Sequence, residues 1–308
     1  MPDAGYEFDA FEISGLPRRP GVAQARAAMR AVGAVRACRR ILQRRRPDVV
    51  LGGGGYVAGP MILAAAGRRI PTALMEADAH LGLANRLAAP FAGRVFLSFP
   101  IPGREGGKYR VTGRPIPAAS GVTMSREEAR ERFFFEQGPV LLVFGGSQGA
   151  RSLNELAVES FGDVGPAVLH LSGERDFAQL AQRVSRPDYR LLPFAPDFGV
   201  ALAAADLVLA RAGGSVWELA AAERPSILVP YPFATADHQT KNARYFAEAG
   251  GAIVVREAEL GLVPDLARSL LDDPDRRAEM AAAMGRVARP DAADEIAEEL
   301  ISLAAARR

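Results

Sequence analysis

The sequence predicts an α/β protein with two Rossmann-like domains, each built on a parallel β-sheet. With 308 residues, the chain is long enough for two domains that each bury a core. Short apolar runs alternate with helix-compatible stretches, a rhythm typical of parallel sheets covered on both faces. Three of these runs end in glycine-rich turns, at residues 52–55, 145–149 and 213–214, where the backbone can approach a ligand closely.

The first domain is expected to cover residues 1–118. Residues 6–13 alternate as a strand does, and residues 22–42 carry apolar side chains at intervals of three and four, which predicts an amphipathic helix. The other expected elements are strands at 47–51, 70–76, 94–98 and 108–112 and a helix at 57–66. Residues 113–121, with two prolines and two glycines, predict the linker to the next domain.

The second domain is expected to cover residues 119–290, where strands and helices alternate most clearly. The predicted strands are 140–144, 167–171, 189–192, 207–210 and 226–230, and the predicted helices are 150–160, 177–184, 200–205 and 215–222. A last helix is predicted at 292–305, after Pro290.

Composition narrows the classes of function. A hydrophobic content of 49% and a charged content of 24% are those of an ordinary globular protein. No uninterrupted run of 18 apolar residues and no signal peptide is visible, so we expect a cytoplasmic chain that does not span a membrane. The single cysteine, Cys38, excludes an internal disulfide and argues against a zinc site.

The positive charge is unevenly distributed, although the formal net charge is only +2. Ten arginines and no acidic residue lie between Arg18 and Arg46, which indicates an anionic partner, either phospholipid or nucleic acid. No aromatic residue lies there, which argues against a single-strand nucleic-acid binder. The helix in this region has two interpretations. It packs on the sheet with a solvated basic rim, or it forms a membrane-surface patch of Met29, Val32 and Val35 with Arg26, Arg30 and Arg36.

The turn at 145–149 predicts an anion site, because it follows an apolar run and opens a helix. Its sequence matches neither the dinucleotide-binding nor the Walker A pattern, so a tight turn without a ligand is equally consistent with it. Three such turns in one chain favour a ligand rich in phosphate.

Four runs, in order, carry a resemblance to a known family. These are GGGGYVAGP (52–60), FGGSQGARSLNE (144–155), RAGGSVWELAAAERPSILVPYP (211–232) and DHQTKNA (237–243). Together they resemble the MurG family, bacterial transferases that add N-acetylglucosamine to undecaprenyl-diphospho-muramoyl-pentapeptide (lipid I) to form lipid II. The resemblance extends over nearly all of the chain.

The resemblance implies a glycosyltransferase of the GT-B architecture that acts in peptidoglycan synthesis, and hence in cell shape and cell division. It implies inverting transfer from UDP-N-acetylglucosamine to lipid I, with no obligatory metal or other cofactor. It places the protein peripherally on the cytoplasmic face of the plasma membrane, at an anionic lipid surface and without nucleic acid. It also implies that residues 291–308 return to the first domain.

The resemblance assigns roles in donor binding residue by residue. Glu218 matches the glutamate that binds the ribose hydroxyls, and Gln239, with Asn242 nearby, matches the amide that binds the sugar. The other matching positions are Ser147 and Gln148 for diphosphate and sugar, Phe194 and Ala195 for uracil, the amides of Gly213, Gly214, Ser215 and Val216 for the diphosphate, and Asp78 in the family's His-Glu-Gln-Asn stretch. From spacing alone, Ser215 and Glu218 also fit a helix capping box.

On the acceptor side, the resemblance assigns Gly54, Gly55 and Tyr56. Where the family carries Gly-Asn-Pro-Val-Arg, this chain has Pro117 in place of the last arginine and an arginine at Arg114, which we also place on the acceptor side.

The family's opening Gly-Gly-Thr-Gly-Gly-His has no match, so the catalytic base stays unassigned, with Glu76 and His80 as candidates. We therefore expect an N-terminally truncated chain with an incomplete first domain and impaired turnover.

Three alternatives remain open. A chain without the opening motif could be a non-catalytic UDP-sugar-binding remnant. A UDP-N-acetylglucosamine epimerase shares the two-domain architecture. A nicotinamide-dependent dehydrogenase fits the spacing of Gly53, Gly55 and Gly59 with Glu76, although Pro60 crowds the helix start.

Overall fold

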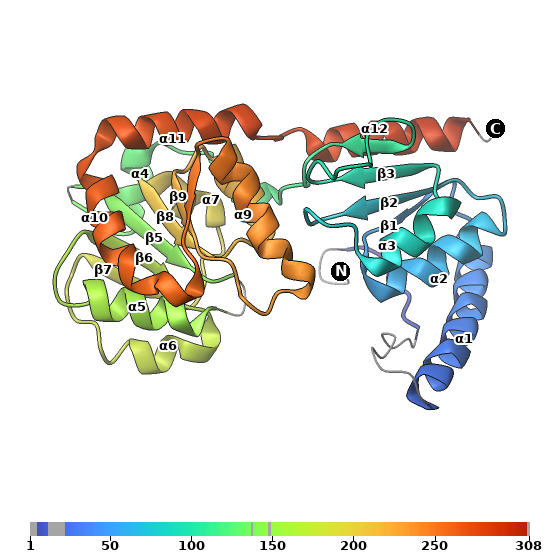
Figure 1. Cartoon of the computed structure of the whole chain (residues 1–308), viewed down its shortest axis with the longest axis horizontal. Coiled ribbons are helices and arrows are strands. Elements are labelled where there is room, and N and C mark those ends of the chain that lie inside the picture. The colour runs from blue at the N-terminus through green and yellow to red at the C-terminus, as the bar shows by residue number, and fades with distance from the viewer. Residues whose placement is uncertain (1–4, 12–21, 137, 147–148, 307–308) are drawn as a thin grey trace. The chain divides into compact units, whose positions relative to one another are not determined.

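The structure, a computed structural model, describes residues 5–11, 22–136, 138–146 and 149–306, with side chains in the first helix from residue 33 onward. The chain divides into two units (Figure 1). Unit 1 comprises Met1–Thr112 and Ala293–Arg308, and unit 2 comprises Gly113–Ala292.

Unit 1 contains a parallel sheet with the strand order β1-β2-β3-β4. Its strands are β1 (Val50–Gly52), β2 (Thr72–Glu76), β3 (Arg94–Leu97) and β4 (Tyr109–Val111), and its helices are α1 (Val22–Arg45), α2 (Gly55–Ala66), α3 (Leu83–Ala88), the short 3₁₀ helix η2 (Ala89–Phe91) and α12 (Ala292–Ala305). No helix in the described part of the chain is both long and apolar enough to span a bilayer.

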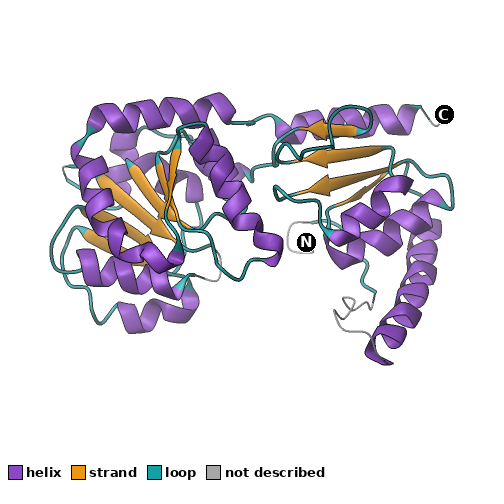
Figure 2. Cartoon of the chain, viewed as in Figure 1, coloured by secondary structure: helices purple, strands orange, loops and turns teal. Residues whose placement is uncertain are grey.

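Helices cover both faces of this sheet (Figure 2). Ile62 of α2 packs in one cluster with Leu74 and Val95, whereas Ile296 of α12 packs in another with Ala73 and Phe96. Because side chains alternate along a strand, neighbouring residues of β2 and β3 bury against opposite layers. The continuous apolar runs seen in the sequence are the consequence.

The strand predicted at residues 6–13 is wrong for its described part, because residues 6–11 form no strand. Asp9 instead pairs with Arg44 and Arg45 near the end of α1. Tyr6 and Phe8 are 70% and 62% exposed. The alternation of apolar and polar residues therefore does not reflect a buried sheet face.

Unit 2 contains a six-stranded parallel sheet with the order β10-β9-β8-β5-β6-β7. Its strands are β5 (Val140–Phe144), β6 (Ala167–Leu171), β7 (Tyr189–Leu192), β8 (Leu207–Ala210), β9 (Ser226–Leu228) and β10 (Ala252–Val254). Its helices are α4 (Arg126–Arg132), α5 (Arg151–Phe161), α6 (Glu174–Leu180), α7 (Phe198–Ala204), α8 (Val216–Ala221), α9 (His238–Glu248), α10 (Val263–Asp272) and α11 (Pro274–Val287), with 3₁₀ turns η3 (Ala118–Ser120), η4 (Thr235–Asp237) and η5 (Glu257–Leu262). These elements follow the predicted alternation.

The strand order reverses at β5. The chain runs outward through β6 and β7, and β8 then returns to pair with the other side of β5, with Phe144 in register with Ala210. The turns that follow β5 and β8 therefore leave the sheet beside each other at its carboxyl edge. Open α/β sheets bind ligands at such a switch point.

Unit 2 begins at Gly113, earlier than the predicted boundary at 118, because the expected linker packs on this unit. A Cβ on Gly199 of α7 would lie 2.0 Å from the carbonyl oxygen of Gly121. A Cβ on Gly113 would lie 2.4 Å from that of Arg289. These close contacts make residues 113–121 a wall of unit 2.

A buried polar chain supports the turn after β5. Asn154 Nδ2 donates to the Ser172 carbonyl at 2.9 Å and to Asp176 Oδ2 at 3.0 Å, so its Oδ1 is the acceptor for His170 Nε2 at 3.0 Å. His170 Nδ1 then accepts from the Tyr189 hydroxyl at 2.8 Å. Burial lowers the pKa of His170 to about 3, so the imidazole is neutral.

We predict that this histidine makes stability depend on pH. Below pH 6.5 the unfolded chain binds a proton that the folded chain rejects, so stability is lost as pH falls from about 6.5 towards 3. Between pH 7.5 and 5 the loss should be about 2 kcal/mol. Urea unfolding of wild type and His170→Gln across this range measures it; parallel pH profiles for the two proteins would contradict the assignment.

Candidate functional site

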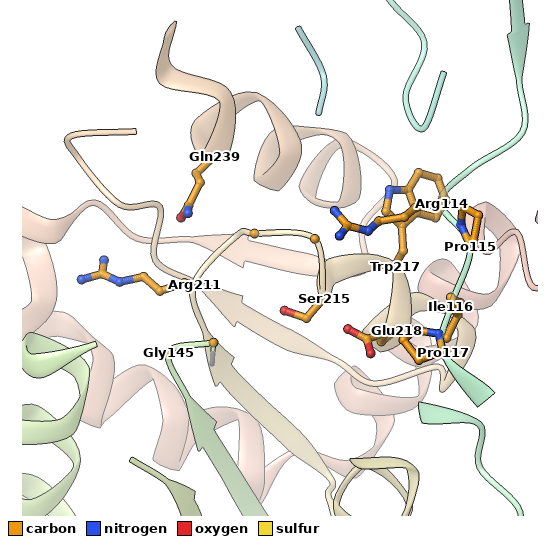
Figure 3. Close-up of a pocket in the computed structure, with 13 residues that line it drawn as sticks. Arg114, Pro115, Ile116, Pro117, Gly145, Arg211, Ser215, Trp217, Glu218 and Gln239 are labelled. Carbon is orange, nitrogen blue, oxygen red and sulfur yellow. The ribbon is translucent and has the colours of Figure 1, made fainter. Parts of the chain in front are cut away.

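A cavity of about 560 Å³ lies in unit 2 at the carboxyl ends of β5 and β8 (Figure 3). Four segments build it: the turn after β5, the turn after β8 with the start of α8, the first residues of unit 2 and the start of α9. Its lining consists of Arg114, Pro115, Ile116, Pro117, Gly145, Gly146, Arg211, Gly213, Gly214, Ser215, Trp217, Glu218 and Gln239. Five of the donor-side residues predicted from the sequence line this cavity: Gly213, Gly214, Ser215, Glu218 and Gln239.

The turn after β5 depends on close backbone approach. Gly149 has φ +69°, and a Cβ there would lie 2.1 Å from the carbonyl oxygen of Ser172. Its amide closes the turn by donating to the Gly146 carbonyl at 2.9 Å. The predicted contacts Ser147 and Gln148 lie outside the described residues.

The turn after β8 presents backbone donors to the cavity. The amides of Gly213, Gly214 and Ser215 donate no hydrogen bond to another described residue. The amide of Val216 was also predicted to bind the diphosphate. It donates instead to the Gly213 carbonyl at 3.3 Å, and the Val216 side chain is buried. Three amides, rather than four, are available to an anion.

Asn242 also has a different place from the predicted one. It is fully buried and does not line the cavity. Its Nδ2 donates to the Ala212 carbonyl at 3.2 Å, so it supports the turn from beneath.

Arg114 lies over the turn after β8. A Cβ on Gly214 would be 2.1 Å from Arg114 Nη1, so the guanidinium lies directly against this glycine and would have to move if a side chain were added. Of the residues predicted on the acceptor side, Arg114 lines the cavity of unit 2, whereas Gly54, Gly55 and Tyr56 belong to unit 1. The place of Arg114 follows from the packing of residues 113–121 on unit 2.

Glu218 points into the cavity from the first turn of α8 (Figure 3). The capping-box interpretation is wrong, because the Ser215 side chain makes no capping hydrogen bond. The Glu218 carboxylate instead accepts a hydrogen bond from the Ser120 hydroxyl. This carboxylate is therefore oriented by a residue distant in the sequence.

A second, smaller cavity adjoins the first. It measures about 280 Å³ and is lined by Phe144, Gly146, Leu171, Pro193, Phe194, Ala195, Phe198, Ser215 and Glu218. Gly146, Ser215 and Glu218 line both cavities. Phe194 and Ala195 were predicted from the resemblance, whereas Phe198 was missed; it packs edge-on against Phe144 with ring centroids 5.1 Å apart.

Gln239 reaches the first cavity from the start of α9. Its Oε1 accepts from the amide of Tyr231 at 2.9 Å, which leaves Nε2 on the side of Gly213, 4.0 Å from where a Cβ on that glycine would lie. In this orientation Gln239 presents a hydrogen-bond donor to a ligand.

Arg211 is a site residue that sequence reasoning missed. It is 8% exposed, donates to Ser152 Oγ at 2.8 Å and to the Val229 carbonyl at 3.1 Å, and pairs with the Glu257 carboxylate. Burial alone would raise the pKa of Glu257, but hydrogen bonds from Arg211 and Ser152 outweigh it and hold the pKa below its ordinary value. The sequence feature that could have identified Arg211 is its position directly after the apolar run of residues 207–210.

In unit 1, Glu76 holds a loop. Its buried carboxylate accepts from the Gly82 amide at 2.8 Å and from Asn85 Nδ2 at 2.9 Å. These bonds fix the segment that contains Asp78 and His80, both half-buried. Asn85, which the sequence analysis overlooked, is 2% exposed and also donates to the Met75 carbonyl at 3.0 Å.

The remaining predicted positions of unit 1 lie on α1 and α2. Gly54 precedes α2 with φ +86°, Gly55 begins the helix, and Tyr56 is 56% exposed. On α1, Val35 packs against the core that contains Cys38. Arg36 is exposed, and the side chains of Arg26, Met29, Arg30 and Val32 lie outside the described residues.

Comparison with known proteins identifies the family. Residues 1–97 match the glycosyltransferase family 28 N-terminal domain, and residues 140–296 match its C-terminal domain. A Rubrobacter xylanophilus protein named UDP-N-acetylglucosamine--N-acetylmuramyl-(pentapeptide) pyrophosphoryl-undecaprenol N-acetylglucosamine transferase is 39% identical, over 98% of this chain and 90% of its own length. The chain belongs to the MurG family. A relative of the same name from Halothermothrix orenii is 35% identical, over 94% of this chain and 84% of its own.

Solved structures agree with this membership. MurG from Acinetobacter baumannii superimposes with a TM-score of 0.71 at 27% identity, covering 90% of this chain and 79% of that one. The S. aureus MnaA-UDP co-structure has a TM-score of 0.65 at 15% identity, covering 88% of this chain and 80% of that one, and shares the fold alone. The MurG comparison agrees with the family, and both comparisons agree with two Rossmann-like domains of the GT-B type.

We predict that Gly149 is more sensitive to substitution than Gly146. Both have positive φ, but a Cβ at Gly149 would meet the Ser172 carbonyl, whereas a Cβ at Gly146 would have no described residue within 4 Å apart from its chain neighbours. Gly146→Ala should lower the free energy of unfolding by about 1–2 kcal/mol, the cost of a left-handed alanine, and Gly149→Ala by clearly more. Urea unfolding of both variants measures the difference. Equal losses would contradict the close approach to Ser172.

Proposed function

We propose that this chain transfers N-acetylglucosamine from UDP-N-acetylglucosamine to N-acetylmuramyl-(pentapeptide) pyrophosphoryl-undecaprenol, or lipid I, forming lipid II. Relatives that carry the name of this activity are 35–39% identical over nearly the whole chain. The observation that carries the proposal in the structure is the pair of cavities that meet at Glu218.

The two cavities have the chemistry of the two ends of a nucleotide sugar. The apolar cavity beside Phe194 and Ala195 suits the uracil ring, which stacks and packs on apolar side chains. Glu218, where the cavities join, suits the ribose, because a carboxylate accepts hydrogen bonds from two hydroxyls. The glycine-lined cavity then takes the diphosphate, with Gln239 positioned to donate to the sugar.

Positive groups converge where the diphosphate would lie. The three available amides of residues 213–215 and the guanidinium of Arg114 line this part of the cavity. Donors fixed in advance stabilise the negative charge that accumulates on a departing UDP, the role that metal ions fill in other enzymes. We therefore propose a transfer that requires no obligatory metal or other cofactor.

The reaction is a single displacement with inversion. The acceptor hydroxyl oxygen forms a bond to the anomeric carbon while the bond from that carbon to the β-phosphate oxygen breaks. The electron pair of the broken bond leaves with UDP, and the hydroxyl proton passes to a base. The candidate base Glu76 already accepts hydrogen bonds from Asp78, Gly82 and Asn85, so it is less available to take this proton than a carboxylate without such bonds.

We further propose that the protein acts peripherally at the cytoplasmic face of the plasma membrane, in peptidoglycan synthesis and thereby in cell shape and division. The support is the arginine-rich stretch between Arg18 and Arg46, which contains no acidic residue, and the lipid part of the acceptor. The same stretch lacks the aromatic residues of single-strand binders, so we expect phospholipid rather than nucleic acid as partner.

We predict that Glu218→Ala weakens UDP binding by about 10- to 100-fold, because two hydrogen bonds to a charged acceptor are lost. Isothermal titration with UDP measures this, and lipid II formation should fall in parallel. Glu131→Ala, which removes an exposed carboxylate from α4 outside both cavities, is the control and should bind like wild type. Undetectable UDP binding by wild type, or unchanged affinity in Glu218→Ala, would overturn the proposed function.

We predict that the chain binds vesicles of anionic phospholipid and that this binding weakens steeply with salt. Replacing the exposed residues Arg36, Arg39 and Arg40 by glutamine should weaken it by about 100-fold, at roughly 1 kcal/mol for each charge. Vesicle sedimentation at low and physiological salt measures the effect, with neutral phosphatidylcholine vesicles as the control. Equal binding to both kinds of vesicle would contradict the proposed surface.

A further inference from the structure

The Glu218 carboxylate, at the junction of the two cavities, has a hydrogen-bond partner from another part of the chain. Ser120 lies 98 residues before Glu218 and donates its hydroxyl to Glu218 Oε1. Neither the four sequence runs nor their spacing pointed to Ser120. The contact joins the wall formed by residues 113–121 to the first turn of α8.

The backbone of Ser120 is firmly placed. Its amide donates to the Pro117 carbonyl at 2.9 Å within η3, and the residue is only 6% exposed. The next residue, Gly121, presses its carbonyl against α7 so closely that a Cβ on Gly199 would lie 2.0 Å away. The hydroxyl therefore approaches Glu218 from a rigid support.

The contact with Ser120 restricts the orientation of the Glu218 carboxylate but uses only part of its capacity to accept hydrogen bonds. A carboxylate has about four acceptor positions, and the serine hydroxyl occupies one of them. A free glutamate side chain samples many rotamers, and fixing it when a ligand binds costs entropy. A hydroxyl that holds Glu218 beforehand removes part of this cost and leaves the other oxygen for a ligand.

We propose that Ser120 is a positioning residue that orients the Glu218 carboxylate towards the ribose hydroxyls of a nucleoside diphosphate. This inference rests on the proposed function, because it assumes that Glu218 binds the ribose. The serine and the ribose both donate to the carboxylate, so they bind it together rather than in competition. Specificity for a ribonucleotide then depends on Ser120 as well as on Glu218.

The opposite role makes a different prediction. If Ser120 held Glu218 away from the ribose, the ligand would have to break the contact on binding. Removing the hydroxyl would then tighten UDP binding rather than weaken it.

The test compares UDP with 2′,3′-dideoxy-UDP, which lacks both ribose hydroxyls, by isothermal titration of the full chain. Wild type should prefer UDP by about 10-fold or more, and Glu218→Ala should lose this preference. Ser120→Ala should bind UDP about three- to tenfold more weakly and leave the affinity for the dideoxy analogue within about twofold of wild type. Ser120→Thr, which keeps the hydroxyl donor, should restore the preference for UDP.

Ser125→Ala is the matched control. Ser125 caps α4 by accepting from the Glu128 amide at 3.2 Å, and it lines neither cavity. Its loss should lower stability by about 1 kcal/mol and should not change the preference for UDP. Ser125→Ala therefore shows how a loss of stability alone affects the binding of UDP and its dideoxy analogue.

The outcomes separate this inference from the function on which it rests. Unchanged or tighter UDP binding by Ser120→Ala, while Glu218→Ala loses the preference, overturns only the role of Ser120. Equal weakening of both ligands by Ser120→Ala also overturns it, since that pattern indicates general damage to the site. No preference for UDP in wild type overturns the proposed function itself.

Discussion

The site depends on the pairing of β5 with β8. These parallel strands are neighbours in the sheet, although β6 and β7 lie between them in the sequence. Their two glycine turns therefore leave the sheet at the same edge. All strands of the sheet point the same way, so the backbone amides of these turns and the charged side chains of Arg114, Arg211 and Glu218 come together at this edge. The register of Phe144 with Ala210 then sets how far apart the two turns begin.

Buried polar groups hold these turns from beneath. Asn154 links the turn after β5 to His170 and Asp176, and Asn242 supports the turn after β8 through the Ala212 carbonyl. Arg211 extends the support through Ser152 and Glu257. Unpartnered polar groups in the same positions would destabilise the fold, so each side chain has to be satisfied for the turn above it to keep its shape.

Much of the fold and of the candidate site could be predicted from the sequence, because the signals were local. The strands of unit 2 and the glycine turns follow from apolar runs that end at glycine. The four sequence runs indicated the family. Ser120, Phe198 and the place of Arg114 could not be predicted, since each depends on a contact between residues far apart in the chain. The capping box at Ser215 failed for a related reason, because Glu218 has a distant partner that spacing cannot reveal. Alternation at residues 6–11 misled because exposed aromatic residues give the same pattern as a half-buried strand.

In the proposed function, one uridine nucleotide spans both cavities of unit 2, with its ribose at Glu218. A crystal structure of the chain with UDP tests it most directly. We expect uracil against Phe194 and Ala195, ribose hydroxyls within hydrogen-bond distance of the Glu218 carboxylate, and the diphosphate on the amides of residues 213–215. Uracil outside the apolar cavity, or a ribose that does not contact Glu218, would contradict it.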